Sequence, residues 1–185
     1  MNNQLKHEKS PYLKQHEKNP VNWLAWNKET LSIAKKEKKP IFLSVGYASC
    51  HWCHVMAHES FENKETANIM NEKFINIKVD REERPDLDSI FQKSLAILTG
   101  AQGGWPLSMF LDENAVPFTG GTYFPPEEMH GRPSFIQVLE NVSNVYSENR
   151  EKIIAQVSQM QAVFKELNRK DSVLKQDYEP YAEKI

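Results

Sequence analysis

Both cysteines of this chain lie in one pentapeptide, Cys-His-Trp-Cys-His at residues 50–54, and the segments around it restrict the fold. Residues 40–46, which precede it, are apolar after an initial proline and have the length of a buried strand. Residues 51–72 can form a helix with a break near residues 60–61. In residues 74–80, isoleucine and valine alternate with polar residues, which indicates a second strand. Strand, C-x-x-C motif, helix and strand form a βαβ unit, whose crossover is almost always right-handed.

This arrangement places Cys50 at a helix N-terminus. Such a terminus carries roughly half a positive charge and free N–H groups, and both favour a thiolate over a thiol. The pKa of cysteine, about 8.5 when free, falls to roughly 3.5–7.5 in C-x-x-C motifs at helix starts. We therefore predict that Cys50 is the attacking thiolate and that Cys53, one turn further in, is the resolving thiol. His51, Trp52 and His54 are the residues expected to tune the pair.

The pentapeptide also fits other chemistry. C-x-x-C-H is the attachment signal of c-type haem, with His54 as axial ligand. A βαβ context and an N-terminus without an apolar signal-peptide core argue against that reading. A metal could use Cys50, Cys53 and His54, joined by His51 or His58, but a structural zinc site needs four ligands and there is no second cysteine pair. A pair of inert buried thiols is the plainest alternative. We predict no cofactor and no metal, and keep metal binding as a minor alternative.

The remaining segments match a thioredoxin fold, an α/β architecture with a central mixed β-sheet flanked by helices. The pattern predicts, in order, a helix, a glycine-rich loop, a strand, a turn and the start of a return strand at residues 86–98, 99–106, 107–111, 112–114 and 116–118. Thioredoxin-like proteins have a cis-proline opposite the cysteines, directly before such a strand. Pro106 occupies that place, so its cis form is implied by the resemblance.

Six motifs in order resemble one family, and they lie at residues 10–16, 19–23, 50–56, 79–86, 103–106 and 120–126. The chain resembles the thioredoxin-like N-terminal domain of the YyaL and spermatogenesis-associated protein family over roughly residues 4–150. The resemblance implies a thioredoxin fold whose activity is not settled. Members usually continue into a longer helical (α/α)-barrel region, similar to sugar epimerases. We therefore expect this chain to be one domain of a larger protein, with that barrel as its partner.

Three regions are predicted along the chain. Residues 1–26 form an irregular N-terminal arm packed on the domain, residues 27–150 the thioredoxin-like domain, and residues 151–185 a C-terminal helix and a linker toward the barrel. Extra helices are expected at residues 27–39, from a capping box at Ser134 onward, and at residues 149–170, before a polar linker at residues 171–185.

The composition agrees with one domain that carries its own core. A length of 185 residues suits a single domain, and a net charge of -2 gives no general attraction to nucleic acid or to an anionic membrane. The apolar runs are far shorter than a membrane helix requires. We predict a cytoplasmic location, where the cysteines would rest mostly as dithiol and act catalytically.

A substrate groove is expected beside the cysteines. The charged run at residues 80–86 follows the second strand, where ligands gather in open α/β sheets. Aromatic side chains could form a rim there, and Phe124 is one candidate. The alternatives are a solvated loop and ordinary core packing. The predicted groove residues are Trp105, Pro106, Gly104, Arg81, Glu82 and Tyr123.

One departure from thioredoxin concerns the resolving thiol. Thioredoxin carries a buried acid on the strand before its C-x-x-C, and the matching place here is near Ser44, with no acid anywhere from residue 40 to residue 50. Glu59, a histidine or water would have to take that role. His7, His16 and His130 are expected to be structural. The His-Trp dipeptide between the cysteines also differs from thioredoxin, so its redox potential does not transfer.

Two hypotheses of function follow. The first is a thiol–disulfide oxidoreductase acting on a protein or small-molecule disulfide or thiol. The second is a thioredoxin-like binding, regulatory or redox-sensing module attached to the barrel. Replacing Cys50 by serine separates them, because only the first predicts loss of disulfide exchange as the defect.

Overall fold

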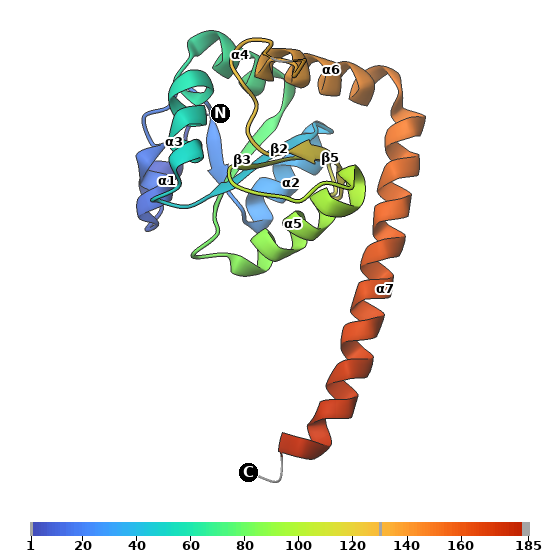
Figure 1. Ribbon diagram of the computed structural model, residues 1–185. Coiled ribbons are helices and arrows are strands. Elements are labelled where there is room, and N and C mark those ends of the chain that lie inside the picture. Colours follow the sequence, from blue (N-terminus) through green and yellow to red (C-terminus); the bar gives the residue numbers. More distant parts are fainter. Residues whose placement is uncertain (1, 130, 183–185) are drawn as a thin grey trace.

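The computed structural model describes residues 2–129 and 131–182, with residues 167–182 described by their backbone alone; His130 lies outside this range. Within it, five strands form one mixed sheet in the order β1-β3-β2-β4-β5 (Figure 1). β1, β2 and β3 run parallel, whereas β4 and β5 pair antiparallel. The strands are β1 (Trp23–Ala25), β2 (Ile41–Gly46), β3 (Ile75–Asp80), β4 (Leu107–Leu111) and β5 (Pro117–Gly121). The predicted α/β thioredoxin-like fold with a central mixed sheet is confirmed.

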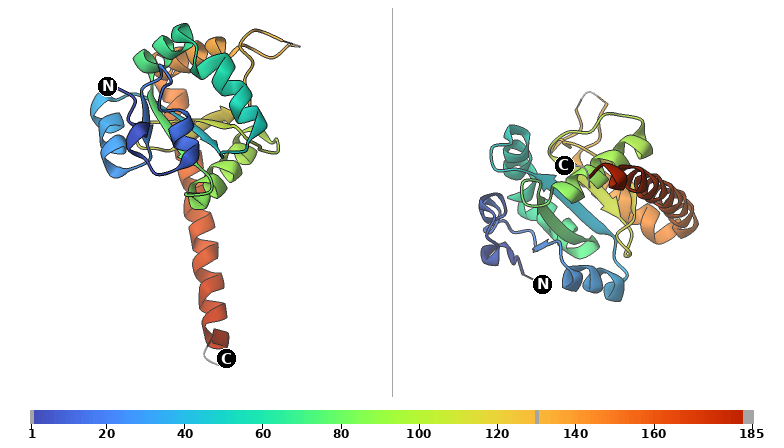
Figure 2. Two further views of the ribbon diagram at one scale, coloured as in Figure 1. Left: turned by 90° about the vertical axis from the view of Figure 1, so that its left-hand side faces the viewer. Right: turned by 90° about the horizontal axis from the view of Figure 1, so that it is seen from below.

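Helices flank both faces of this sheet (Figure 2). They are η1 (Leu5–His7), α1 (Pro11–Gln15), α2 (Lys28–Glu37), α3 (His51–Met56), η2 (Ala57–Phe61), α4 (Lys64–Lys73), α5 (Pro85–Thr99), α6 (Phe135–Glu148) and α7 (Arg150–Ala182). The predicted caps are present, since Asn27 caps α2 and Ser134 with Gln137 forms a capping box on α6. The expected break after the cysteines is a π-helical turn, η2, ended where Asn63 caps α4.

Both ends of the chain contain more regular secondary structure than expected. The arm is not irregular, because Ser10 caps α1, Pro11 occupies its first turn, and β1 pairs with β3 at the sheet edge. At the other end, α7 continues past Lys170 to Ala182, where a linker was expected. α7 packs on the domain through Ile153 and then extends away from it (Figure 1). Among the described residues, no helix is both long and apolar enough to cross a membrane.

The two central strands present contrasting side chains to the two faces of the sheet. One face, here called the aliphatic face, is covered by α2 and α5 and consists of Ile41, Leu43, Val45, Ile75, Ile77 and Val79. The other, the cysteine face, is covered by the arm, α3, α4 and α6 and consists of Phe42, Ser44, Gly46, Asn76, Lys78 and Asp80. All these residues are buried, so the polar residues of β3 do not face water. The Cys50–Cys53 motif at the beginning of α3 therefore lies on the side of the sheet that carries the buried polar residues.

Candidate active site

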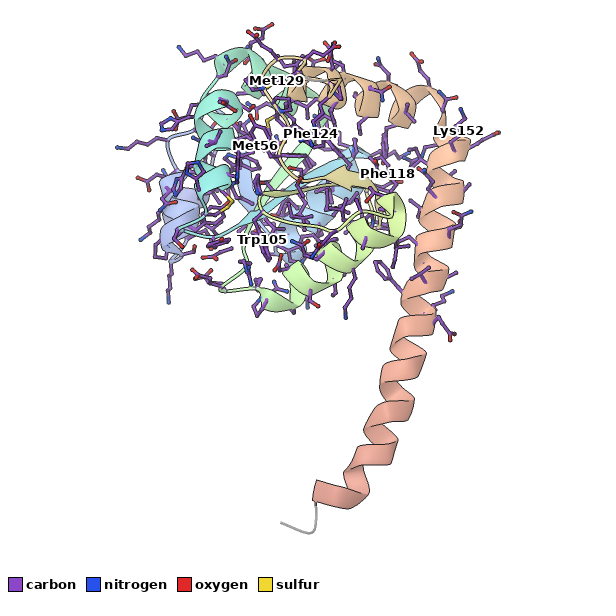
Figure 3. The ribbon with its side chains drawn as sticks, in the orientation of Figure 1. Met56, Trp105, Phe118, Phe124, Met129 and Lys152 are labelled. Carbon is purple, nitrogen blue, oxygen red and sulfur yellow. A yellow bond between two sulfur atoms is a disulfide. The ribbon has the colours of Figure 1, made fainter. Side chains whose placement is uncertain are left out.

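Cys50 and Cys53 lie together at the beginning of α3. Cys50 is the N-cap residue, and its Sγ accepts the backbone N–H of Cys53 at 3.2 Å. The two Sγ atoms are 2.14 Å apart, as a disulfide, which is visible at the beginning of α3 (Figure 3). In this form Cys50 is 3% and Cys53 2% exposed. The N–H donor at Cys50 would equally stabilise a thiolate there once the disulfide opens.

The residues between and after the cysteines face outward. His51 is exposed and Trp52 is 53% exposed, with the two ring centroids 5.7 Å apart. The Nε2 of His54 lies 2.8 Å from the carbonyl oxygen of Ala48, which can only accept, so this nitrogen carries the proton. His54 therefore holds the loop that leads into Cys50, and it contacts that loop rather than a sulfur.

Aromatic residues near the site form two separate pairs rather than one rim. Trp52 contacts Tyr123 with centroids 5.1 Å apart, and Tyr47 contacts Trp105 at 5.9 Å. Phe124 stacks instead on Phe135 in the core at 6.0 Å, well away from Trp105 (Figure 3).

A surface hydrogen bond anchors the first of these pairs. The Tyr123 hydroxyl donates to Glu59 at 2.6 Å, and burial together with this carboxylate raises the pKa of Tyr123 to about 12. Glu59 is therefore held at the exposed surface and is not placed to serve a buried thiol.

Pro106 lies at the end of the sheet that leads into the cysteine loop. Its peptide bond with Trp105 is cis. Leu107 pairs with Val45, so Pro106 precedes this pair at the same end of the sheet as Gly46. Pro106, just before β4, and the loop from β2 to Cys50 therefore lie at the same end of the sheet.

The indole of Trp105 is held by one residue from the turn after β3 and one from α5. Its Nε1 donates to Asp88 at 2.9 Å, and the Arg81 guanidinium lies 3.9 Å from the ring centroid. Arg81 also approaches Asp88 at 3.5 Å. The Gly104 carbonyl accepts from Gln92 at 3.1 Å, which ties the glycine-rich loop to α5. These contacts give the predicted groove one ordered wall.

Glu82 does not join that wall. It is exposed in the loop after β3, and its backbone N–H donates to Asp80 Oδ1 at 2.8 Å. Of the predicted groove residues, Arg81, Gly104, Trp105 and Pro106 thus form one group. Tyr123 contacts Trp52 instead, and Glu82 belongs to neither group.

A buried polar layer lies beneath the cysteines. Lys78 is 1% exposed, and its Nζ donates to the Ser44 hydroxyl at 2.9 Å. The same nitrogen lies 5.1, 4.8 and 4.6 Å from the ring centroids of Tyr12, Trp23 and Phe61. Burial lowers the pKa of Lys78 well below its ordinary value, while the aromatic faces favour its protonated form.

The arm closes this layer. The Ser10 hydroxyl donates to Asp80 Oδ2 at 2.6 Å, and the two residues are 70 positions apart in the sequence. His16 is buried, its Nδ1 lies 2.9 Å from Asn19 Oδ1, and burial together with Lys78 lowers the pKa of His16 to about 2. His16 is thus a neutral core residue, in agreement with the structural role expected for it.

Sequence reasoning did not single out Tyr12 or Lys78. Ser44 lies at the centre of β2, directly opposite Lys78 in the register, so the place expected for a buried acid holds a hydroxyl next to an amine. The available signal was weak, because Lys78 occupies a polar position in an alternating strand and Tyr12 belongs to an arm motif.

Metal ligation finds no support in side-chain geometry. Within the part of the chain that the structure describes, no three His, Cys, Asp or Glu side chains are grouped as metal ligands. His58 is engaged by Glu62 at 2.9 Å on the surface.

Known proteins match this chain in sequence and in fold. A model of the Thioredox_DsbH family, described as a protein of unknown function, DUF255, matches residues 2–165. An uncharacterized protein of Caenorhabditis elegans is 44% identical over 182 residues, which cover 95% of this chain and 25% of that protein. Human spermatogenesis-associated protein 20 is 49% identical over 152 residues, which cover 82% of this chain and 19% of that protein. The chain therefore spans a quarter or less of the length of these relatives.

A solved structure agrees on the fold. The structure titled DsbH oxidoreductase aligns with a TM-score of 0.50 and 18% identity, over 69% of this chain and 85% of that one. The residues matched by the family model, 2–165, include the cysteine pair, β4 with Pro106 before it, and the arm motifs described above. The chain therefore belongs to the Thioredox_DsbH family and carries the thioredoxin-like domain of the YyaL and spermatogenesis-associated proteins that its motifs resemble.

Proposed function

We propose that this domain is a thiol–disulfide oxidoreductase in which Cys50 attacks and Cys53 resolves. The observation that carries the proposal is the pairing of Cys50 and Cys53 at the N-terminus of α3 on a thioredoxin-like sheet. A C-x-x-C motif in this position provides a thiolate and a second thiol one helical turn away. Both are needed for reversible exchange.

The first step is attack on a substrate disulfide. The Cys50 thiolate, stabilised by the N–H of Cys53, attacks one sulfur of the substrate, and the other leaves as a thiolate. Cys50 is then joined to the substrate in a mixed disulfide. The outward-facing ring of Trp52 and the wall formed by Trp105 and Arg81 would border the bound substrate.

The second step releases the substrate. The Cys53 thiolate attacks Cys50 Sγ, the Cys50–Cys53 disulfide forms, and the remaining substrate sulfur leaves as a thiolate that takes a proton from solvent. Two electrons have then passed from the cysteine pair to the substrate. The reverse sequence oxidises a substrate dithiol, so the direction depends on the potentials of the two couples.

A redox-sensing module of a larger protein is the second candidate. It is favoured by the small exposure of both cysteines, 3% and 2%, and by relatives several times longer than this chain. In that case the disulfide would alter contacts with a neighbouring region, which we propose to be an (α/α)-barrel. We further propose a cytoplasmic location with a protein or small-molecule thiol or disulfide as partner.

The test is a redox titration of the protein in glutathione buffers, followed by trapping of free thiols and mass measurement. The oxidoreductase proposal predicts a reversible two-electron transition between about -120 and -270 mV, the range of known oxidoreductases. Cys50→Ser is the control and should show no such transition. Failure of the wild-type protein to form the disulfide in oxidising buffer would reject the proposal. A transition in glutathione buffer together with no exchange with added peptide or protein disulfides would favour the redox-sensing module.

A further inference from the structure

The N-terminal arm brings Tyr12 to the inner side of Cys53. Gly46 shows how close the two side chains come. A Cβ placed on Gly46 would lie 2.3 Å from the Tyr12 hydroxyl oxygen and 2.7 Å from Cys53 Sγ. The hydroxyl and the sulfur are therefore near neighbours across the space that glycine leaves open.

Tyr12 is only 1% exposed, and no described residue accepts a hydrogen bond from its hydroxyl. The nearby Ser44 hydroxyl favours the ionised form of Tyr12, so it acts as a donor toward the Tyr12 oxygen and leaves the Tyr12 proton without an acceptor. Buried polar groups are nearly always paired, so a free donor beside Cys53 calls for an explanation. In the disulfide form Cys53 Sγ is bonded to another sulfur and is a weak acceptor. As a thiolate it becomes a strong, charged acceptor.

The surroundings of Tyr12 keep it in the donor form. Burial first, and the nearby charge of Asp80 second, raise the pKa of Tyr12, while the Ser44 hydroxyl acts in the opposite sense. The groups that face Tyr12 are Lys78 and Asp80 from β3 and His16 from the arm, whose ring centroid is 5.1 Å away. Protonated Lys78 would add favourable charge for a thiolate on this side of the sheet.

We propose that the Tyr12 hydroxyl donates a hydrogen bond to Cys53 Sγ whenever the disulfide is open, so that the arm is part of the redox site. The inference rests on the proposed oxidoreductase function and answers what replaces the buried acid of thioredoxin near Ser44. Tyr12 stabilises the resolving thiolate through a hydrogen bond that is absent in the disulfide. It thereby favours the reduced state and speeds the release of substrate from Cys50.

The experiment compares Tyr12→Phe with the matched control Tyr146→Phe. The Tyr146 hydroxyl donates to Glu113 on a different part of the domain, so removing it tests the loss of a tyrosine hydroxyl away from the cysteines. The first readout is the equilibrium with glutathione. A hydrogen bond to a charged sulfur predicts that Tyr12→Phe shifts this equilibrium about tenfold or more toward the disulfide. Tyr146→Phe should leave it unchanged.

The second readout separates a chemical role from a structural one. Glutathione release from a mixed disulfide at Cys50 is followed as a function of pH. Tyr12→Phe should slow release about tenfold near neutral pH and move the profile to higher pH. A variant with only loosened packing would not displace the profile.

Each outcome has a defined meaning. If wild-type protein exchanges with glutathione and Tyr12→Phe behaves like it, the Tyr12 inference is wrong and the oxidoreductase proposal stands. Equal shifts in Tyr12→Phe and Tyr146→Phe would also overturn the inference. If the wild-type protein does not exchange, the oxidoreductase proposal falls, and the inference falls with it.

A second measurement decides the matter should Tyr12→Phe fail to fold. The double variant Tyr47→Phe and Tyr123→Phe removes the other tyrosines close to the site, and its remaining tyrosines are labelled with ¹³C at Cζ. The inference predicts that one signal shifts when the disulfide is reduced. Identical spectra of the oxidised and reduced protein would overturn it.

Discussion

The two faces of the central sheet are built from the same strands but hold the domain together in different ways. On the aliphatic face, every inward residue of β2 and β3 is an isoleucine, leucine or valine. On the cysteine face, the alternate positions carry a phenylalanine, a serine, a glycine, an asparagine, a lysine and an aspartate. Both sets are buried. Burial of apolar area stabilises both faces, but on the cysteine face the polar strand residues also need partners to offset their loss of water.

The arm supplies many of those partners, and this explains why it is ordered. It covers Lys78 with the rings of Tyr12 and Trp23, and Ser10 binds Asp80. The aliphatic face is covered by α2 and α5, whereas on the cysteine face the arm also provides hydrogen-bonding and aromatic partners for buried polar side chains. The difference teaches that polar strand residues can be buried where a segment distant in the sequence supplies their partners.

The largest expected effect comes from the aliphatic face. Leu43→Ala removes a fully buried side chain and should lower the free energy of unfolding by about 2–5 kcal/mol. Because Leu43 points away from the cysteines, the glutathione equilibrium should stay within about threefold of wild type. Urea denaturation and thiol trapping measure the two quantities. A large redox shift in this variant would show that the two faces are not independent.

Acid should act on the cysteine face through His16. Its pKa is lowered to about 2 in the folded protein, against an ordinary 6.5, so the unfolded chain binds a proton that the folded protein does not. Stability is then lost as the pH falls below 6.5, by about 3 kcal/mol near pH 4.5. Denaturation midpoints between these pH values measure the loss.

A matched pair of histidine variants isolates that effect. His16→Gln should be less stable at pH 7 but should lose stability more slowly in acid, whereas His7→Gln, at an exposed position, should keep the wild-type slope. An unchanged slope in His16→Gln would contradict a neutral buried His16.

The close approach at Gly46 sharpens the comparison further. Gly46→Ala would press on both the Tyr12 hydroxyl and Cys53 Sγ, and such overpacking costs about 1–3 kcal/mol. Gly104→Ala is the control, since its Cβ would meet only the Thr122 methyl at 3.7 Å and should change stability little. Equal stability of the two variants, measured by urea denaturation, would mean that Tyr12 and Cys53 are not in close contact.

The smallest stability effect is expected at Trp52. This side chain is 53% exposed, so Trp52→Ala should change the free energy of unfolding by no more than about 0.5 kcal/mol. If Trp52 borders the substrate, exchange with a peptide disulfide should slow several-fold, while exchange with glutathione disulfide changes less. Stopped-flow measurement with both substrates checks this. Equal rates for wild type and variant would remove Trp52 from the substrate surface.

The sequence predicted local features well. The strand before the cysteines, the helix after them and the caps at Asn27 and Ser134 follow from short patterns of apolar residues and side-chain acceptors. The burial of Lys78 could not be predicted from such short patterns. Alternation in β3 is typical of a strand with one face in water, and here the arm together with α3, α4 and α6 buries that face.

The role of Tyr12 was not predicted for the same reason: its approach to the cysteine region joins two segments that are far apart in the chain. For Phe124 the sequence left two readings open, an aromatic rim or core packing. Its neighbour Tyr123 contacts Trp52, whereas Phe124 stacks on Phe135, so the structure agrees with core packing for Phe124.

The central claim is that the cysteine face holds an unequal pair, with Cys50 attacking and Cys53 resolving. It is tested most directly by the rates at which Cys53→Ser and Cys50→Ser form a mixed disulfide with glutathione disulfide, measured by mass at neutral pH. Cys50 lies at the helix N-cap with an N–H donor, whereas Cys53 faces the interior beside Tyr12. The account predicts that Cys53→Ser, which retains Cys50, reacts at least about tenfold faster. Equal rates, or a faster reaction of Cys50→Ser, would contradict it.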